Sequence, residues 1–173
     1  MKRLAKRGFT LVEIMIVVAI IALLAAIAIP NVLRGRATAN ESAAIGNMRA
    51  LVSSLEMYRS VNNLYPFAAA NWVSYMYTTP DPDFGPPSFN HVMDGSACPP
   101  GAASSCTQGY RYTYVSAAGS VYTLSAIPDV LGNTGTRSFF VDESGVIRHE
   151  LGNSGATVAC NAIDQPPSAA ASC

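Results

Sequence analysis

The chain has 173 residues, of which 50% are hydrophobic and 13% are charged. A typical soluble domain carries about 25% charged residues, so the composition disfavours a soluble cytosolic enzyme. Eleven basic and eleven acidic residues give a formal net charge of zero, whereas a protein that binds nucleic acid generally needs a basic surface, and we predict no specific nucleic-acid partner.

The amino-terminal segment combines a basic leader with a long apolar run. Residues 1–8 hold four of the eleven basic groups, and the 21 residues from Phe9 to Ile29 contain one charged residue, Glu13. As a helix this run is about 30 Å long, which matches the hydrocarbon core of a bilayer. The positive-inside rule places the leader in the cytoplasm. We therefore predict a single-pass protein with an exported body.

Two simpler interpretations of this segment compete. One is a secretory signal peptide cleaved after Ala26-Ile27-Ala28, but an apolar signal region normally has about 7–15 residues, and Phe9–Ile29 is longer. The other is a plain membrane anchor. A carboxylate within a membrane helix costs about 2.5–3.5 kcal/mol on insertion scales, so Glu13 predicts a partner for its charge.

The residues around this charge resemble a known family. Gly8-Phe9-Thr10-Leu11-Val12-Glu13, the apolar run and then Pro30 are similar to the amino terminus of type IV pilins and type II secretion pseudopilins. The resemblance covers about residues 1–66. It implies that a prepilin peptidase cuts between Gly8 and Phe9, and that the new terminal Phe9 is N-methylated.

The physical chemistry of the cut segment suggests how subunits assemble. Cleavage creates an amine on Phe9, and Glu13 of one subunit can neutralise the amine of a neighbour where water is excluded. A subunit that slips leaves Glu13 unpaired, which is costly. Pro30 removes a backbone hydrogen bond, so we expect a kink or looser helix over Ala26–Pro30. Residues 9–30 form the expected transmembrane and filament-core helix, and Phe9, Glu13 and Pro30 are the predicted assembly residues.

Residues 31–64 form a second, amphipathic part of the helix, which we expect to end near Asn62. One apolar stripe at helical spacing predicts the face that packs on the body; it comprises Ala44, Met48, Leu51, Leu55 and Tyr58, widened by Ile45 and Val52. Glu56 and Arg59 form an i,i+3 ion pair of small value. Asn62-Asn63-Leu64-Tyr65-Pro66 ends the helix.

The remaining chain predicts a loop region followed by a sheet. Residues 65–109 are rich in proline and glycine and read as a variable loop with one short helix near Asn71–Tyr77. Alternation over 110–116, followed by a turn, predicts a hairpin with 121–127, and 137–142 with 145–150 reads as a second hairpin through the turn at 143–145. The expected fold is therefore α+β and type IV pilin-like: a long helix packed on an antiparallel sheet of three to four strands.

Within this sheet, Tyr110, Tyr112 and Tyr114 lie on one face of a strand. We favour core packing over electron transfer as the role of this row of tyrosines.

Four cysteines lie in the exported part: Cys98, Cys106, Cys160 and Cys173. An even number in an oxidising compartment indicates disulfides. Three pairings are open, and we favour Cys98–Cys106 with Cys160–Cys173. The second bond would fix the tail of the 110–173 region.

The sequence predicts no cofactor and no metal site. No Cys-x-x-Cys motif occurs, and neither His91 nor His149 lies near a cysteine in sequence. The weak calcium candidates, whose oxygens suit that ion, are Asp81, Asp83 and Asp94. A plain turn remains the preferred interpretation because prolines flank the first two.

The expected function is a non-enzymatic subunit of a type IV filament, either a pilin or a pseudopilin. The resemblance implies other copies, a prepilin peptidase, an inner-membrane assembly platform and, before assembly, membrane lipid as partners. It places the chain in the bacterial inner membrane with a cytoplasmic amino terminus and a periplasmic body, and then in a periplasmic or cell-surface filament.

Two alternatives leave the chain unpolymerised: an anchored adhesin or receptor, and an exported hydrolase. No Gly-x-Ser-x-Gly or His-Glu-x-x-His motif supports the hydrolase. The titratable cluster Asp142, Glu143, His149 and Glu150 is more simply a solvated hairpin, and we predict no catalytic residues.

Overall fold

The computed structural model describes residues 9–67, 71–78, 83–91, 93–94, 106–117, 119–152 and 161–162. The chain divides into two compact units, Met1–Gly35 and Arg36–Cys173. Helix α1, Leu11–Asn62, contributes to both units.

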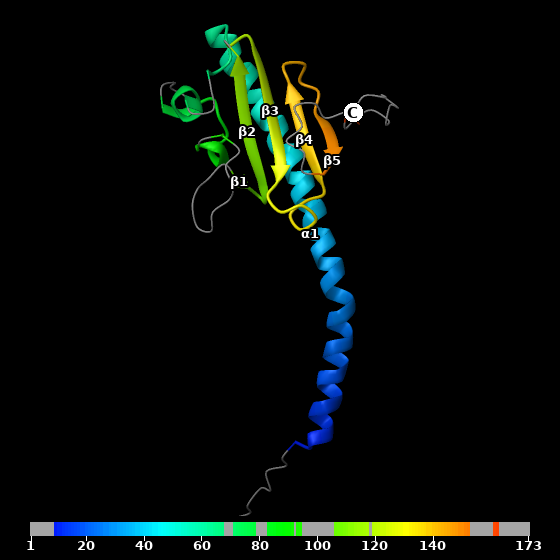
Figure 1. Ribbon diagram of the computed structural model, residues 1–173. Helices are drawn as coiled ribbons and strands as arrows, with labels where there is room; N and C mark the ends of the chain where they lie inside the picture. The colour runs from blue at the N-terminus through cyan, green and yellow to red at the C-terminus, as the bar shows by residue number, and fades with distance from the viewer. Residues whose placement is uncertain are drawn as a thin grey trace, which may run out of the picture. The chain divides into compact units, whose positions relative to one another are not determined.

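In the first unit, α1 is an apolar helix with its side chains exposed. Leu11, Ile20 and Leu33 are each about half exposed or more, as are the other large apolar residues before Arg34. Among the described residues, α1 is the helix that is long and apolar enough to cross a membrane. The helix continues through Pro30 (Figure 1). Next to this proline, the side-chain amide of Asn31 donates a hydrogen bond to the Ile27 carbonyl at 3.2 Å.

The second unit contains one antiparallel sheet with six strands in chain order. The strands are β1 (Cys106–Thr107), β2 (Tyr110–Ala117), β3 (Val121–Pro128), β4 (Arg137–Asp142), β5 (Arg148–Leu151) and β6 (Asn161–Ala162). The α+β class is confirmed, but the prediction of three to four strands was too low. The two missed strands have two residues each, too few to show the alternation that marks a strand in sequence.

One strand boundary was also wrong. The last predicted strand began at Gly145, whereas β5 begins at Arg148. Residues 143–147 instead form the turn, in which the amide of Gly145 donates to the Asp142 carbonyl at 2.9 Å. Gly145 has φ 71°, a left-handed conformation that glycine adopts without steric cost.

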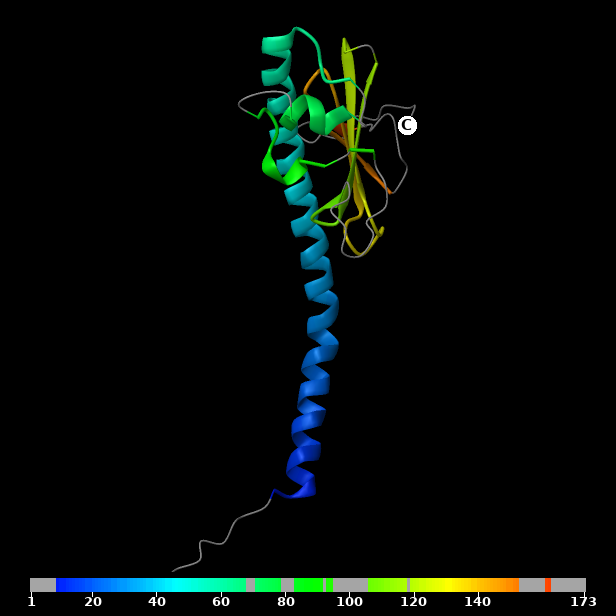
Figure 2. The ribbon, with the colours of Figure 1, turned by 90° about the vertical axis from the view of Figure 1, so that its left-hand side faces the viewer.

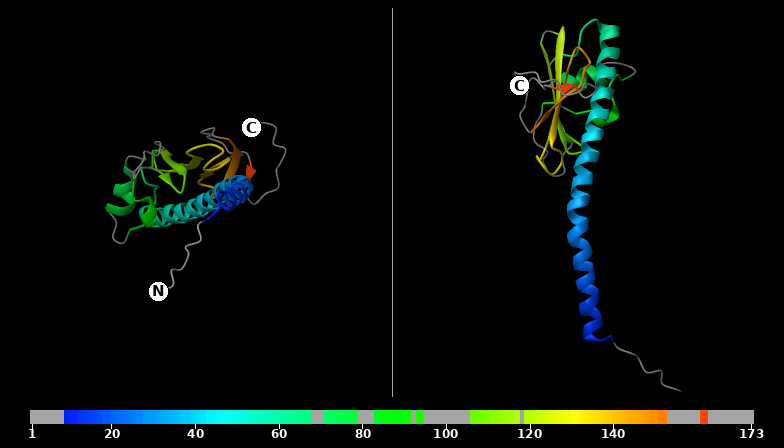
Figure 3. Two further views of the ribbon diagram at one scale, coloured as in Figure 1. Left: turned by 90° about the horizontal axis from the view of Figure 1, so that it is seen from below. Right: turned by 90° about the vertical axis from the view of Figure 1, so that its right-hand side faces the viewer.

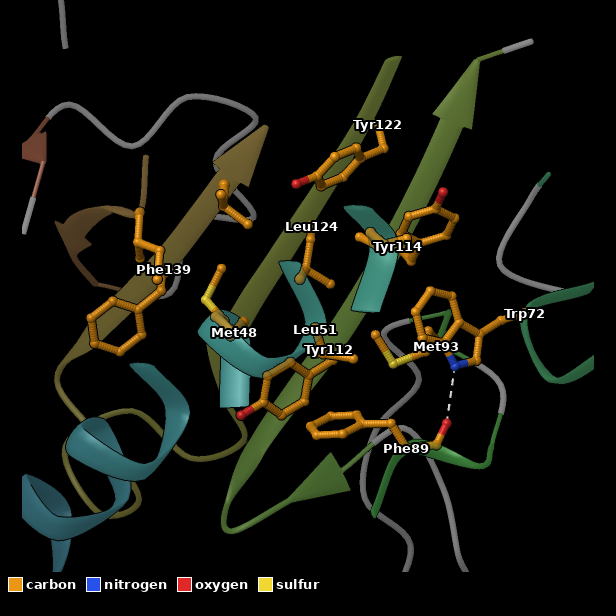
Figure 4. Packing of buried hydrophobic residues seen from close by; sticks show 14 of the residues in the cluster. Met48, Leu51, Trp72, Phe89, Met93, Tyr112, Tyr114, Tyr122, Leu124 and Phe139 are labelled. Atoms are coloured by element: carbon orange, nitrogen blue, oxygen red, sulfur yellow. Dashed lines mark hydrogen bonds between the residues drawn. The ribbon is translucent and has the colours of Figure 1, made fainter. Parts of the chain in front are cut away.

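The second half of α1 lies along one face of the sheet (Figures 2 and 3). All five residues of the predicted stripe are buried. Figure 4 shows Met48 and Leu51 among Tyr112, Leu124 and Phe139 from the sheet. The row of tyrosines on β2 is fully buried between the helix and the sheet, so the prediction that it packs in the core is confirmed. The helix ends as predicted, with Asn63 in the left-handed region at φ 57°.

Two short helical segments close the side of this core. The π-helical turn η2, Ser74–Thr78, overlaps the predicted short helix, whereas the 3₁₀ turn η3, Pro87–Phe89, was not predicted. The indole of Trp72 donates to the Phe89 carbonyl at 3.0 Å. The amide of Tyr114 donates to the Met93 carbonyl at 2.8 Å. This connecting region is therefore part of the core and borders the sheet edge.

Candidate assembly site

The start of α1 is a capping box. The Glu13 carboxylate accepts hydrogen bonds from the backbone amide and the hydroxyl of Thr10, both at 2.8 Å. In return, the Glu13 amide donates to the Thr10 hydroxyl at 3.2 Å. This reciprocal pattern satisfies donors that a helix start leaves unpaired. Glu13 therefore stabilises the first turn of its own helix before any neighbour is considered.

The predicted processing residues lie at the edge of the described structure. Gly8 lies outside the described residues, whereas Phe9 is 84% exposed. The capping box begins directly after Phe9, so a cut before Phe9 would leave Thr10 and Glu13 together on the processed chain. The exposed apolar helix behind them is a continuous surface of the kind that marks a protein or membrane contact.

Glu41 ties the body to the first turns of α1 in the second unit. Its side chain is 8% exposed. The carboxylate accepts hydrogen bonds from the Thr136 amide and hydroxyl, both at 2.7 Å, and from Arg137 Nε at 3.1 Å. The contact closes the β3–β4 loop onto the helix. Sequence analysis did not identify it, because Glu41 is 95 residues from Thr136 in the chain.

The charge of Glu41 is well compensated. Burial alone would raise the pKa of its carboxyl group, but the hydrogen bonds from Thr136 and the Arg137 guanidinium outweigh burial. The pKa of Glu41 therefore lies below its ordinary value. The carboxylate is ionised at neutral pH and holds the loop through charge-assisted hydrogen bonds.

Two neighbouring contacts fix the same loop. The side-chain amide of Asn40 donates to the Thr134 carbonyl at 2.9 Å, and the Tyr110 hydroxyl donates to the Arg137 carbonyl at 2.8 Å. A side chain at Gly135 would collide with the buried Tyr110 ring. Glycine is thus needed there for the close approach of loop and strand.

Beside this loop lies a polar pocket of about 360 Å³. It is lined by Arg36, Asn40, Gln108, Gly109, Asn133 and Thr134. The lining contains one guanidinium group and three side-chain amides but no carboxylate, a composition that suits an anionic group.

In the titratable cluster considered for a hydrolase, Asp142 is engaged in structural contacts, whereas Glu143 is exposed. Asp142 accepts a hydrogen bond from Arg148 Nη1 at 2.8 Å and bonds from the Ser144 amide and hydroxyl. Asp142 is therefore not simply solvated. Burial opposes its ionisation, but these bonds outweigh burial and lower its pKa.

The predicted disulfide and metal-binding residues lie only partly within the described residues. Cys106 begins β1, whereas Cys98, Cys160 and Cys173 lie outside the described residues, so the disulfide pairing stays a prediction. Within the described ranges, no three potential metal ligands gather.

The calcium proposal also stays a prediction, because one of its three aspartates, Asp81, is not described. Asp83 is exposed. The backbone of Asp94 forms an isolated antiparallel β-bridge with Thr113 of β2.

Comparison with known proteins supports the amino-terminal resemblance. Residues 3–29 match a family model described as the prokaryotic N-terminal methylation motif. The chain is 39% identical over 66 residues to type II secretion system core protein G of Klebsiella michiganensis, covering 38% of this chain and 46% of that protein. It is 44% identical over 68 residues to the type IV wide pilus major component PilA4 of Thermus thermophilus, covering 39% and 52%.

A third relative, type II secretion system core protein G of Escherichia coli, is 41% identical over 61 residues, covering 35% of this chain and 42% of that protein. The chain spans about half the length of the curated relatives it matches. No solved structure gives a significant match. The predicted similarity to pilins and pseudopilins is confirmed.

The pKa of Glu41 yields a prediction for stability. Because this pKa is depressed when folded, the carboxylate stabilises the body above its ordinary pKa of 4.5, and this contribution is lost as the pH falls through the folded pKa. We expect Glu41→Gln to reduce stability at pH 7 by about 1–2 kcal/mol, discounted for the exposed Arg137. Thermal unfolding of the full chain in detergent between pH 7 and pH 3 measures this difference.

The wild-type chain and the Glu41→Gln variant should have the same stability at acidic pH. Asp142 titrates in both, so the difference between them isolates Glu41. A constant difference across the whole pH range would contradict a stabilising role for the ionised Glu41 carboxylate.

Proposed function

We propose that the chain is a non-enzymatic structural subunit of a helical type IV filament, either a pilus or a type II secretion pseudopilus. The single observation that carries the proposal is the amino terminus: a methylation motif whose glutamate caps an exposed apolar helix. An apolar surface of this extent needs lipid or other copies of the helix to cover it.

The two states follow from the same surface. In the membrane, lipid covers the helix; in a filament, the helices of neighbouring copies do. The methylation motif and the apolar helix indicate membrane anchoring. Under the proposal, prepilin peptidase cuts between Gly8 and Phe9, the body faces the periplasm, and an inner-membrane platform adds the processed subunit to the filament.

Glu13 has a separate task in each state. In the single chain its carboxylate is held by Thr10. In the filament, the Phe9 amine of a neighbouring copy supplies an opposite charge where water is excluded, and Coulomb attraction is strongest there. A carboxylate held at the helix start is positioned for such a partner without further ordering.

The proposal is tested by isolating filaments from cells that produce the chain. Sheared or periplasmic material is sedimented at high speed, and the pellet is examined by electron microscopy and probed for this chain. We expect regular filaments that contain the chain. Recovery only as dispersed membrane protein, or only as a soluble body, would overturn the proposal in favour of the anchored or exported alternatives.

A further inference from the structure

We infer that the polar pocket around Arg36 receives Glu143 from a second copy of this chain, and that this contact joins successive bodies in the filament. The inference rests on the proposed function and names a subunit contact outside the apolar helix. It is supported by the pocket, by the pairing of charged side chains among the described residues, and by the positions of Arg36 and Glu143 in the fold.

The first observation concerns charge pairing. Throughout the described ranges, every charged side chain except two has a hydrogen bond, an ion pair or an electrostatic contact within the chain. The two exceptions are Arg36 and Glu143, one cation and one anion, and both are exposed. Both groups are therefore free to pair with a partner of opposite charge.

The second observation is that these two charges cannot meet within one body. Arg36 lines the pocket with Asn133 and Thr134 of the β3–β4 loop, at one end of β4. Glu143 directly follows Asp142, the last residue of β4, at the other end of the strand. Figure 1 shows the β3–β4 loop and the β4–β5 turn at opposite ends of the sheet. A six-residue strand separates these ends by about 20 Å.

The third observation is the fit of the two surfaces. Glu143 lies on the tip of a tight turn, where Ser144, Gly145 and Val146 are also exposed. The turn is held rigid by the bonds that Asp142 accepts from Ser144 and Arg148. On the neighbouring copy, the pocket offers the guanidinium of Arg36 and the exposed side-chain amides of Gln108 and Asn133. A carboxylate on a rigid turn is complementary to such a pocket.

Filament symmetry requires this kind of contact. A helical filament is built from heterologous interfaces, in which one surface of a copy meets a different surface of the next. Two complementary groups at opposite ends of the body satisfy that requirement, whereas a self-complementary patch would close a dimer. Each added subunit would bury one such pair, so a modest contact is repeated along the filament.

The test is a charge-reversal cycle in the full chain. Arg36→Glu and Glu143→Arg each place like charges in the contact, and we expect each to lower the amount of sedimentable filament by about tenfold. The double variant restores opposite charges and is expected to recover most of the wild-type yield. Because the pair is exposed and electrostatic, raising ionic strength should reduce wild-type assembly and narrow the gap between variants.

Matched controls separate this contact from general charge effects. Asp83 is another exposed acid, outside the β4–β5 turn, and combining Asp83→Arg with Arg36→Glu should not restore assembly. Thermal unfolding of each variant in detergent should match wild type, because both positions are exposed.

The outcomes distinguish failure of this contact from failure of the proposed function. Wild-type filaments with unaffected single variants, or with a double variant that fails to recover, would overturn the contact and leave the filament function intact. Absence of filaments from the wild-type chain itself would overturn the proposed function and the contact with it.

Discussion

Replacing Glu13 with alanine is expected to abolish filament assembly while the chain still accumulates in the membrane. The variant loses the partner of the neighbouring Phe9 amine, which then lies uncompensated in the packed filament. Breaking one side of a buried pair costs about 3 kcal/mol or more, which corresponds to about a hundredfold weaker association. The measurement compares sedimentable filament with membrane-bound chain for both proteins.

A second variant at this position separates charge from helix capping. Glu13→Gln retains an oxygen that can accept the Thr10 hydrogen bonds but removes the negative charge. If pairing with the amine is the task of Glu13, this variant fails like alanine. Normal filaments from Glu13→Gln would instead assign the role of the residue to the capping box.

Leu51→Ala is expected to destabilise the body strongly. Leu51 is fully buried in the layer between helix and sheet, and such a truncation removes apolar contacts and leaves a cavity. The cost is about 3 kcal/mol, or a fall of about 10 °C in the unfolding midpoint of a body this size. Thermal unfolding of the full chain in detergent measures it.

The matched control lies on the same helix. Met57 is 53% exposed, so Met57→Ala should change stability by no more than about 0.5 kcal/mol. Equal effects of the two substitutions would contradict the packing of α1 against the sheet.

The second half of α1 could be predicted because its information is local. Apolar residues from Ala44 to Tyr58 at spacings of three and four mark one helix face, and that face is buried. Strands β2 and β3 were found for the same reason, because their apolar residues alternate over eight residues, and β4 was found as a short apolar run followed by a turn. Strands β1 and β6 have two residues each, and their pairing depends on neighbours rather than on their own pattern.

The contacts at the candidate sites also differ in whether they are local in sequence or long-range. The capping box has a sequence signature, Thr10-x-x-Glu13, and was missed because Glu13 was interpreted only as a membrane charge. Glu41 has no such signature. Its partners Thr136 and Arg137 follow 95 and 96 residues later, so only the folded chain brings these groups together.

The Arg36 pocket was equally invisible in the sequence. It is built from a helix, the β1–β2 turn and the β3–β4 loop, and none of these segments is distinctive alone. Folding brings the three together around one cation, and the chemistry of the pocket follows from that arrangement.

Processing of this chain as a filament subunit is tested most directly by the amino-terminal residue and intact mass of the chain in the filament fraction. We predict a chain that begins with N-methylated Phe9, with a mass four hydrogens below the thiol form if the four cysteines form two disulfides. A chain that begins at Ile29 would contradict assembly through the apolar helix, because ordinary signal-peptide cleavage would remove Glu13 and that helix.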